Sequence, residues 1–322
     1  MSEAPAAGTV RVAAVDCGTN SLRLLVADVD PVAGTLTDVE RTMAVVRLGQ
    51  GVDATGAFAP EALGRTFAAL DEAAATCRRH GVGPDAIRFV ATSASRDVSN
   101  RDVFADGVRA RLGVAPEVVS GEEEAALSFA GATRELLGTR PGPFLVVDLG
   151  GGSTELVLGA AQLEAARSVD VGSVRMTERH LHDDPPTPAQ VAAARADVEA
   201  VLDGVDVPLE RTRTLVGVAG SVTTVTAVAL GLDAYAAGSV HGAVLPLADV
   251  RAACDRLLAM TRAERAALPV VHPGRVDVIG AGALVWRAVL DRVEALAGVE
   301  EVVTSEHDIL DGIAFSVAAR RA

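Results

Sequence analysis

Lysine is absent from this sequence: all 29 basic residues among its 322 residues are arginines. The absence excludes phosphate-loop NTPases, Schiff-base enzymes and the actin-like ATPases that depend on a lysine. Aromatic residues make up only 3% of the chain, but 49% of it is hydrophobic and 22% charged, which is typical of a folded protein. Its apolar runs are far shorter than the ~20 residues of a membrane-spanning helix, so the sequence predicts a soluble protein.

Cysteine is also scarce. Cys17, Cys77 and Cys254 are odd in number, widely spaced and without a CxxC motif. This pattern disfavours a disulfide framework, a structural zinc site and an oxidising compartment, and it predicts buried small residues. The first ten residues lack the basic and apolar segments of a secretory signal, so we expect a cytoplasmic protein.

Positive charge is in deficit as well, because the formal net charge is −14 and the pI is near 4.9. Nucleic acids and anionic membranes bind broad basic surfaces, so neither is expected as a partner. A polyanionic ligand would need local arginines, backbone N–H groups and a divalent metal.

A repeated segment is the most informative feature present. VAAVDCGTNSLRLLV, from Val12, aligns with FLVVDLGGGSTELVL, from Phe144, at a constant offset of 132 residues. The alignment places Asp16 on Asp148, Gly18 on Gly150, Ser21 on Ser153 and Arg23 on Glu155. A repeat at this spacing, in a chain too long for one core, predicts two similar domains that face each other across a cleft.

Periodicity predicts an α/β arrangement in both halves. We expect strands at 10–28, 36–48, 87–92, 117–119, 162–169, 214–218 and 301–304. Helices are expected at 60–81, 100–112, from about 121, around 177, at 189–202, from 221, at 277–297 and from about 307.

Each repeat carries an Asp-x-Gly turn at the end of a strand, where small residues let backbone N–H groups approach phosphate oxygens. A single glycine-rich turn is often only a tight turn, but two such turns favour anion binding. Asp16 and Asp148 would hold a divalent metal; the alternative is that each merely caps its turn.

The ordered motifs DCGTNSLRLLV, ATSASRD, SGEEEA, VVDLGGGSTELV and DVGSVR resemble the exopolyphosphatase and guanosine-pentaphosphate phosphatase family, within the actin, Hsp70 and sugar-kinase superfamily. The resemblance spans about residues 10–317. It implies two actin-like (ribonuclease H-like) domains, residues 1–126 with 305–322 and residues 127–304. It also implies hydrolysis of terminal phosphate from polyphosphate with Mg²⁺, and a homodimer.

The resemblance further assigns individual roles. Glu124 would be the catalytic base, with Glu155, Asp16 and Asp148 around metal and water. The phosphate-binding residues would be Asn20, Ser21, Arg23, Arg96, Gly151, Gly152, Ser153 and Thr154.

Residue chemistry agrees in part. Phosphoanhydride hydrolysis needs charge neutralisation and an oriented water, and no covalent intermediate. In the first turn of a helix about 100° separates Glu122, Glu123 and Glu124, so at most two face one side, and we expect Glu122 and Glu123 to be solvated. Arg175 is left open between substrate contact and structure. His307, with Asp308, is expected to begin a helix.

Several functions remain open at this stage. The first is an exopolyphosphatase, for which short chains are preferred because no further domain extends a basic channel. Its rivals are a guanosine pentaphosphate 5′-phosphatase, an actin-like or Hsp70-like ATP-binding module, and a non-catalytic polyphosphate sensor. The ATP-binding module is disfavoured by the lack of lysine and by Gly220, which stands alone where related kinases have a glycine pair.

Overall fold

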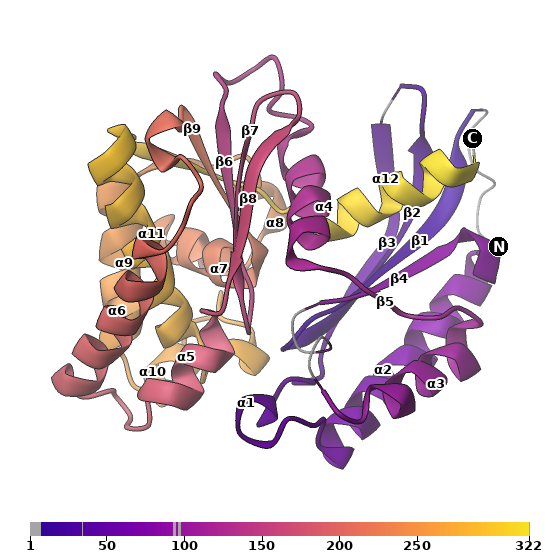
Figure 1. The fold of residues 1–322 in the computed structure, drawn as a ribbon, viewed down its shortest axis with the longest axis horizontal. Coiled ribbons are helices and arrows are strands. Elements are labelled where there is room, and N and C mark those ends of the chain that lie inside the picture. The colour runs from indigo at the N-terminus through magenta and orange to yellow at the C-terminus, as the bar shows by residue number, and fades with distance from the viewer. Residues whose placement is uncertain (1–7, 34, 93–94, 96–97, 322) are drawn as a thin grey trace. The chain divides into compact units, whose positions relative to one another are not determined.

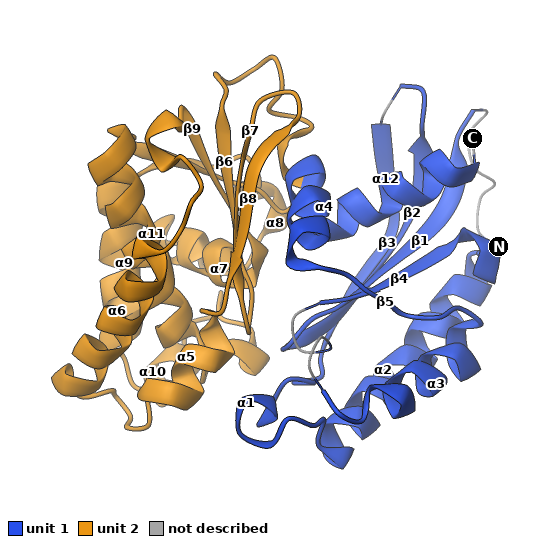
Figure 2. Cartoon of the chain, viewed as in Figure 1, with its two compact units in different colours: residues 1–131, 309–322 blue, residues 132–308 orange. Residues whose placement is uncertain are grey.

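The computed structural model describes residues 8–33, 35–92, 95 and 98–321. These residues form two compact units, coloured separately in Figure 2. Unit 1 comprises Met1–Gly131 and Ile309–Ala322, and unit 2 comprises Ala132–Asp308. The predicted domain limits, residues 1–126 with 305–322 and residues 127–304, stay a prediction.

Unit 1 is a mixed five-stranded sheet with helices on both faces (Figure 1). Its strands are β1 (Val10–Cys17), β2 (Ser21–Asp30), β3 (Thr35–Val45), β4 (Ile87–Ala91) and β5 (Glu117–Val118). Its helices are α1 (Val52–Thr55), α2 (Pro60–Arg79), α3 (Arg101–Leu112), α4 (Gly121–Thr133) and α12 (Ile309–Arg321). The strand order is β3-β2-β1-β4-β5, antiparallel from β3 to β1 and parallel from β1 to β5.

Alternation along β1 divides unit 1 into two cores. Ala13 and Val15 belong to the core that contains α2 and α3, whereas Val12 and Ala14 belong to the core that contains α12. Successive side chains of a strand point to opposite faces, so a strand that is apolar throughout must be covered twice. The continuous hydrophobic run in the sequence therefore marks a central strand.

Helices α4 and α12 cross at very short range on the second face. A Cβ atom on Gly312 of α12 would lie 2.0 Å from the carbonyl oxygen of Leu127 in α4. Only glycine permits this approach, because real Cβ contacts do not occur under 3.0 Å. The crossing fixes the position of α4 on unit 1.

Unit 2 repeats this design around a six-stranded sheet. Its strands are β6 (Phe144–Leu149), β7 (Thr154–Gly159), β8 (Leu163–Val169), β9 (Thr214–Val218), β10 (Val244–Pro246) and β11 (Glu301–Thr304). Its helices are α5 (Ser173–His180), α6 (Pro188–Asp203), α7 (Ala219–Ala229), α8 (Ala237–Val240), α9 (Leu247–Ala259), α10 (Arg262–Ala266) and α11 (Ile279–Ala297). The order β8-β7-β6-β9-β11 matches β3-β2-β1-β4-β5, with the same strand directions, and β10 is an antiparallel addition.

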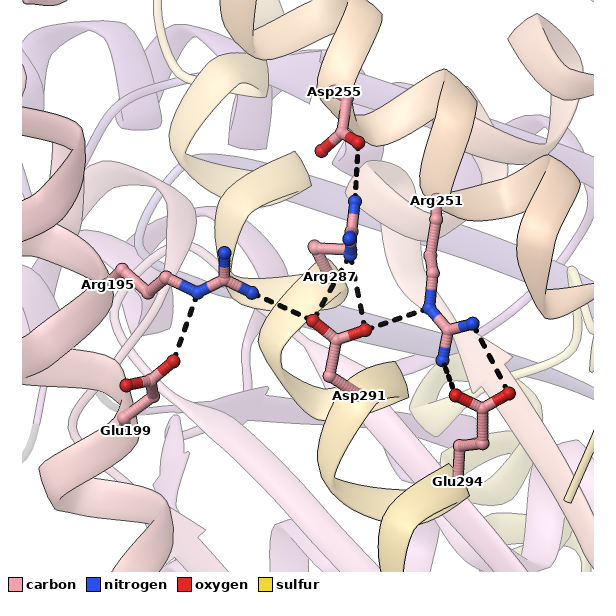
Figure 3. Close-up of polar contacts among 7 residues, drawn as sticks. All are labelled: Arg195, Glu199, Arg251, Asp255, Arg287, Asp291 and Glu294. Atoms are coloured by element: carbon pink, nitrogen blue, oxygen red, sulfur yellow. Dashed lines mark hydrogen bonds and ion pairs between the residues drawn. The ribbon is translucent and has the colours of Figure 1, made fainter. Parts of the chain in front are cut away.

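One large hydrophobic core joins the unit 2 sheet to α6, α7, α9 and α11. Trp286 of α11 is fully buried, and its ring packs so closely on Gly217 of β9 that an added Cβ would lie 2.8 Å away. On the outer side, Asp291 of α11 accepts hydrogen bonds from arginines of three helices (Figure 3). They are Arg195 at 2.8 Å, Arg251 at 2.8 Å and Arg287 at 3.2 Å. This network fastens α6 and α9 to α11.

Most predicted elements are present, with shifted ends. The expected strand at 36–48 spans Thr35–Val45, and the last helix begins at Ile309, directly after His307 and Asp308. The segment between α7 and α11, for which we predicted no elements, contains α8, β10, α9 and α10. The three cysteines are free and buried, as predicted. Among the described residues, no helix is both long and apolar enough to span a bilayer.

Candidate functional site

The β1–β2 hairpin of unit 1 places Asp16 opposite Arg23. Asp16 is only 5% exposed, and Arg23 donates to its Oδ2 atom from Nε at 3.0 Å and from Nη2 at 2.7 Å. A buried carboxylate requires such a charged partner. Arg23, predicted as a phosphate ligand, therefore also neutralises the predicted metal ligand Asp16.

The turn of this hairpin is tight and anchored. The Gly18 N–H donates to the Ser21 carbonyl oxygen at 3.0 Å, and the Asn20 carbonyl accepts the N–H groups of Val46 and Arg47 at 2.9 Å. These bonds tie the predicted phosphate-binding residues Asn20 and Ser21 to the end of β3. Their backbone is thereby held in one conformation before any ligand arrives.

The equivalent turn of unit 2 repeats the hydrogen bond 132 residues later: Gly150 N–H donates to the Ser153 carbonyl at 3.0 Å. It is also fastened to the start of α5, because the Ser173 N–H donates to the Gly150 carbonyl at 3.0 Å. Gly172 precedes α5, and a Cβ on it would lie 2.5 Å from the Gly151 carbonyl oxygen. The glycine in the DVGSVR motif is thus required for this close packing.

The glycine turn has three N–H groups that the described part of the fold does not use. Within the described chain, the N–H groups of Gly151, Gly152 and Ser153 donate no hydrogen bond to another residue. Arg175 also fixes the turn, since its Nε donates to the Gly152 carbonyl at 2.7 Å. Three consecutive N–H groups of this kind on a fixed turn suit an anion-binding nest, the name kept below for Gly151–Ser153. Of the two roles left open for Arg175, substrate contact and structure, this contact shows a structural role on the turn.

Acidic side chains lie beside this nest on the β6–β7 pair. Asp148 and Glu155 stand directly opposite each other, 7% and 1% exposed. Glu155 Oε1 accepts a 2.7 Å hydrogen bond from Ser168, and the Thr154 hydroxyl donates at 2.7 Å to the Val171 carbonyl. The hydroxyl proton of Thr154 is used in this hydrogen bond, so the hydroxyl oxygen can only accept a hydrogen bond from a ligand.

The first turn of α4 carries three glutamates in different environments. Ser120 caps the helix: its Oγ accepts the Glu123 N–H at 3.1 Å, and its carbonyl accepts the Glu124 N–H at 2.9 Å. Glu122 is exposed and Glu124 is only 7% exposed, so the helix turns the predicted base into the protein. Glu123 is exposed as predicted, and its carboxylate also accepts a 2.6 Å hydrogen bond from the buried Arg88, which the sequence did not predict.

Arg96, the remaining predicted phosphate ligand, lies outside the described residues. The sequence reasoning missed two residues that shape the candidate site, Gly172 and Arg88. Gly172 lies within the DVGSVR motif, and its spacing from the glycine turn could have indicated a contact with that turn. No pattern in the sequence separates Arg88 from the surface arginines.

A second group of possible metal ligands, Glu135, His241 and His307, gathers within unit 2. Nδ1 of His241 accepts the Glu306 N–H at 3.1 Å, so Nε2 carries the proton and donates it to Glu135 at 2.9 Å. A metal on Nε2 would need that proton on Nδ1, where it would oppose the Glu306 N–H. The hydrogen bonds thus fit a carboxylate–imidazole pair better than a metal centre.

Asp16 and Asp148 have the chemistry that a divalent cation requires. Both are buried carboxylates at the ends of central strands, and hard oxygen donors of this kind suit Mg²⁺. Glu155 adds a second carboxylate beside Asp148. Each unit therefore supplies oxygen donors of the kind that the predicted cofactor needs.

Comparison with known proteins gives one consistent result. The family model of the Ppx/GppA phosphatase family matches residues 25–317. The chain is 53% identical to Exopolyphosphatase 2 of Mycobacterium tuberculosis over 317 residues, covering 96% of this chain and 98% of that protein. The crystal structure of an exopolyphosphatase-like protein superposes with a TM-score of 0.93 at 47% identity, covering 98% of this chain and 99% of the other. That of an exopolyphosphatase from Cytophaga hutchinsonii gives 0.85 at 25% identity, with 97% and 98% coverage.

Proposed function

Because the chain belongs to the Ppx/GppA phosphatase family, we propose that it is an exopolyphosphatase that releases orthophosphate from the ends of inorganic polyphosphate. The observation that carries the proposal is the nest at Gly151–Ser153, whose three available N–H groups suit the oxygens of a terminal phosphate. The 53% identity to an exopolyphosphatase over nearly the whole of both chains supports this substrate class.

The proposed chemistry is direct hydrolysis. Glu124 accepts a proton from the attacking water, the water oxygen bonds to the terminal phosphorus, and the bridging P–O bond breaks, leaving the shortened polyphosphate as an anion. Arg23 and the Gly151–Ser153 nest bind the phosphate oxygens, whose negative charge is highest in the transition state. The burial of Glu124 supports its role, since the first turn of α4 directs this carboxylate into the protein and leaves that of Glu122 exposed.

Asp16 and Asp148 are the residues proposed to hold a divalent cation, with Mg²⁺ as the expected ion, and Glu155 is proposed as a second catalytic carboxylate. Such a cation neutralises phosphate oxygens when bound. The pairing of Arg23 with Asp16 neutralises that carboxylate within the protein. A cytoplasmic location and a homodimer remain predictions; light scattering after size-exclusion chromatography measures the second.

The activity is tested by orthophosphate release from four substrates: short polyphosphate, long polyphosphate, guanosine pentaphosphate and ATP. We expect the highest kcat/KM with short polyphosphate, because a chain of net charge −14 repels phosphates beyond the binding residues. Faster turnover of guanosine pentaphosphate than of any polyphosphate would instead make this protein the nucleotide phosphatase of the family.

The base is tested by a matched pair of substitutions. Glu124→Gln should lower kcat by about 10²- to 10⁴-fold, the usual contribution of a general base, with little change in KM. Glu122→Gln removes the same charge from the same helix turn at an exposed position and should stay near wild type. Equal, small effects of the two substitutions would contradict the assignment.

A further inference from the structure

Arg88 is a buried arginine within unit 1, only 4% exposed. It lies on β4, and its guanidinium has three partners. Nε and Nη2 donate to Glu117 Oε2 at 2.9 and 2.7 Å, Nη2 donates to Glu123 Oε1 at 2.6 Å, and Nη1 donates to Ser316 Oγ at 2.8 Å. One side chain therefore connects β4, β5, α4 and α12.

The position of Arg88 on its strand directs it to these partners. Its neighbour Phe89 packs in the core beneath α2 and α3, whereas Val90 packs with α12 on the opposite face. Arg88 shares the face of Val90 because side chains alternate along a strand. Glu117 lies on β5, three residues before the Ser120 cap of α4, and Glu123 lies in the first turn of α4.

The bond to Glu123 replaces an internal helix contact. Ser120-x-x-Glu123 has the sequence of a capping box, in which the glutamate would turn back to the N-cap N–H. Here Ser120 caps the Glu123 N–H at 3.1 Å, and the carboxylate of Glu123 extends to Arg88. The first turn of α4 is thereby tied to the sheet rather than only to itself.

A second fastening point limits the other motions of α4. The contact of Gly312 with the Leu127 carbonyl lies one turn further along α4, and Ser316 follows Gly312 by one turn on the same face of α12. Arg88 holds the first turn of α4 and Gly312 contacts the next turn, so the two contacts together restrain α4 against rotation about its axis and against sliding along α12. Rotation would move Glu124, the residue next to Glu123.

We propose that Arg88 is a positioning residue that orients Glu124 for catalysis through the carboxylate of Glu123. The proposal rests on the proposed function, in which Glu124 is the base. Arg88 does not contact the substrate in this scheme, because its guanidinium is buried and bonded to the protein on all three sides. Its effect on the reaction is carried by the orientation of α4.

The test removes the link at its exposed end, because truncating Arg88, which is only 4% exposed, would leave a cavity beneath α4 and α12 and endanger folding. Glu123→Ala breaks the contact, and Glu122→Ala is the matched control, with the same loss of charge and of one glutamate from the same turn. We expect Glu123→Ala to lower kcat about 10- to 100-fold with KM nearly unchanged, since a misplacement near 1 Å costs up to about 10²-fold. Glu122→Ala should stay within about 2-fold of wild type.

Two further variants separate positioning from plain stability. Glu123→Gln keeps an oxygen that can accept from Arg88, and it should recover most of the lost kcat. In a Glu124→Gln background, Glu123→Ala should lower kcat no further, because a residue that acts only through Glu124 has nothing left to position. A merely structural role would reduce the residual rate again.

The outcomes distinguish this proposal from the one on which it rests. If Glu124→Gln leaves phosphate release unchanged, the assignment of the base fails. If Glu124→Gln abolishes release while Glu123→Ala matches Glu122→Ala, the base stands and the positioning role of Arg88 is overturned. Multiplicative losses in the double variant would overturn it as well.

Discussion

Gly172→Ala is the sharpest probe of the glycine turn, because the structure fixes how far the turn must move. The added Cβ would lie 2.5 Å from the Gly151 oxygen, 2.6 Å from its carbonyl carbon and 2.8 Å from the Gly152 carbonyl carbon. Ordinary contact begins at 3.4 Å, so the turn must move by about 0.9 Å. All three atoms are backbone, and no flexible side chain can give way instead.

That displacement is applied directly to the N–H groups proposed to bind phosphate. A misplacement of 1 Å in a positioning group costs about 10²-fold, so kcat/KM should fall by that factor, or about 2.7 kcal/mol of transition-state stabilisation. Overpacking should also cost about 1–3 kcal/mol of stability, which lowers Tm by roughly 2–12 °C. Phosphate release is therefore measured well below the Tm of the variant.

Gly238→Ala is the control, since this α8 glycine belongs to the same unit and an added Cβ would meet no atom within 4 Å. Its kcat/KM should equal that of wild type. The reasoning is refuted if Gly172→Ala loses stability as expected but keeps kcat/KM within about 2-fold of the control. The nest would then tolerate the displacement, and phosphate binding would have to be assigned elsewhere.

Three other predictions concern charge and thiols. Arg23→Ala should raise KM about 10- to 100-fold, because it removes charge-assisted hydrogen bonds to phosphate. It should also lower Tm, because Asp16 loses its ion-pair partner. A lower Tm at constant KM would leave Arg23 with a structural role only. Asp148→Ala should abolish metal-dependent turnover, and a magnesium titration with a normal response would eliminate its metal role. Burial raises the pKa of the Cys77 thiol to about 11 and raises the pKa values of Cys17 and Cys254 further. Thiolate is therefore scarce at pH 8, and a thiol reagent should label the protein quickly only after denaturation.

The sequence predicts the fold well wherever the information is local or repeated. The sequence repeat that aligns Asp16 with Asp148 corresponds to a structural repeat. The two sheets share the same strand pairing and strand order, and the same hydrogen bond closes each turn. No element was predicted for the α9 segment, which lies between α7 and the long α11 helix. Its apolar positions, such as Leu247 and Val250, are buried against that helix.

The candidate site was predictable in its residues but less so in their partners. Burial of Glu124 next to exposed Glu122 agrees with the helical spacing of 100° per residue. The contact between Glu123 and Arg88 joins residues 35 positions apart, and only the packing of α4 on the sheet brings them together. The predicted roles in binding phosphate, metal and water remain predictions for the experiments above.

The two matching hairpins differ in the sign of one side chain. Asp16 stands opposite an arginine and forms an ion pair with it, while Asp148 stands opposite Glu155, a second carboxyl group. Like charges across a strand pair repel each other, and a cation relieves the repulsion. Duplication has thus kept the shape of the hairpin while changing its electrostatics: one copy pairs opposite charges within the protein, and the other sets two oxygen-donor side chains side by side.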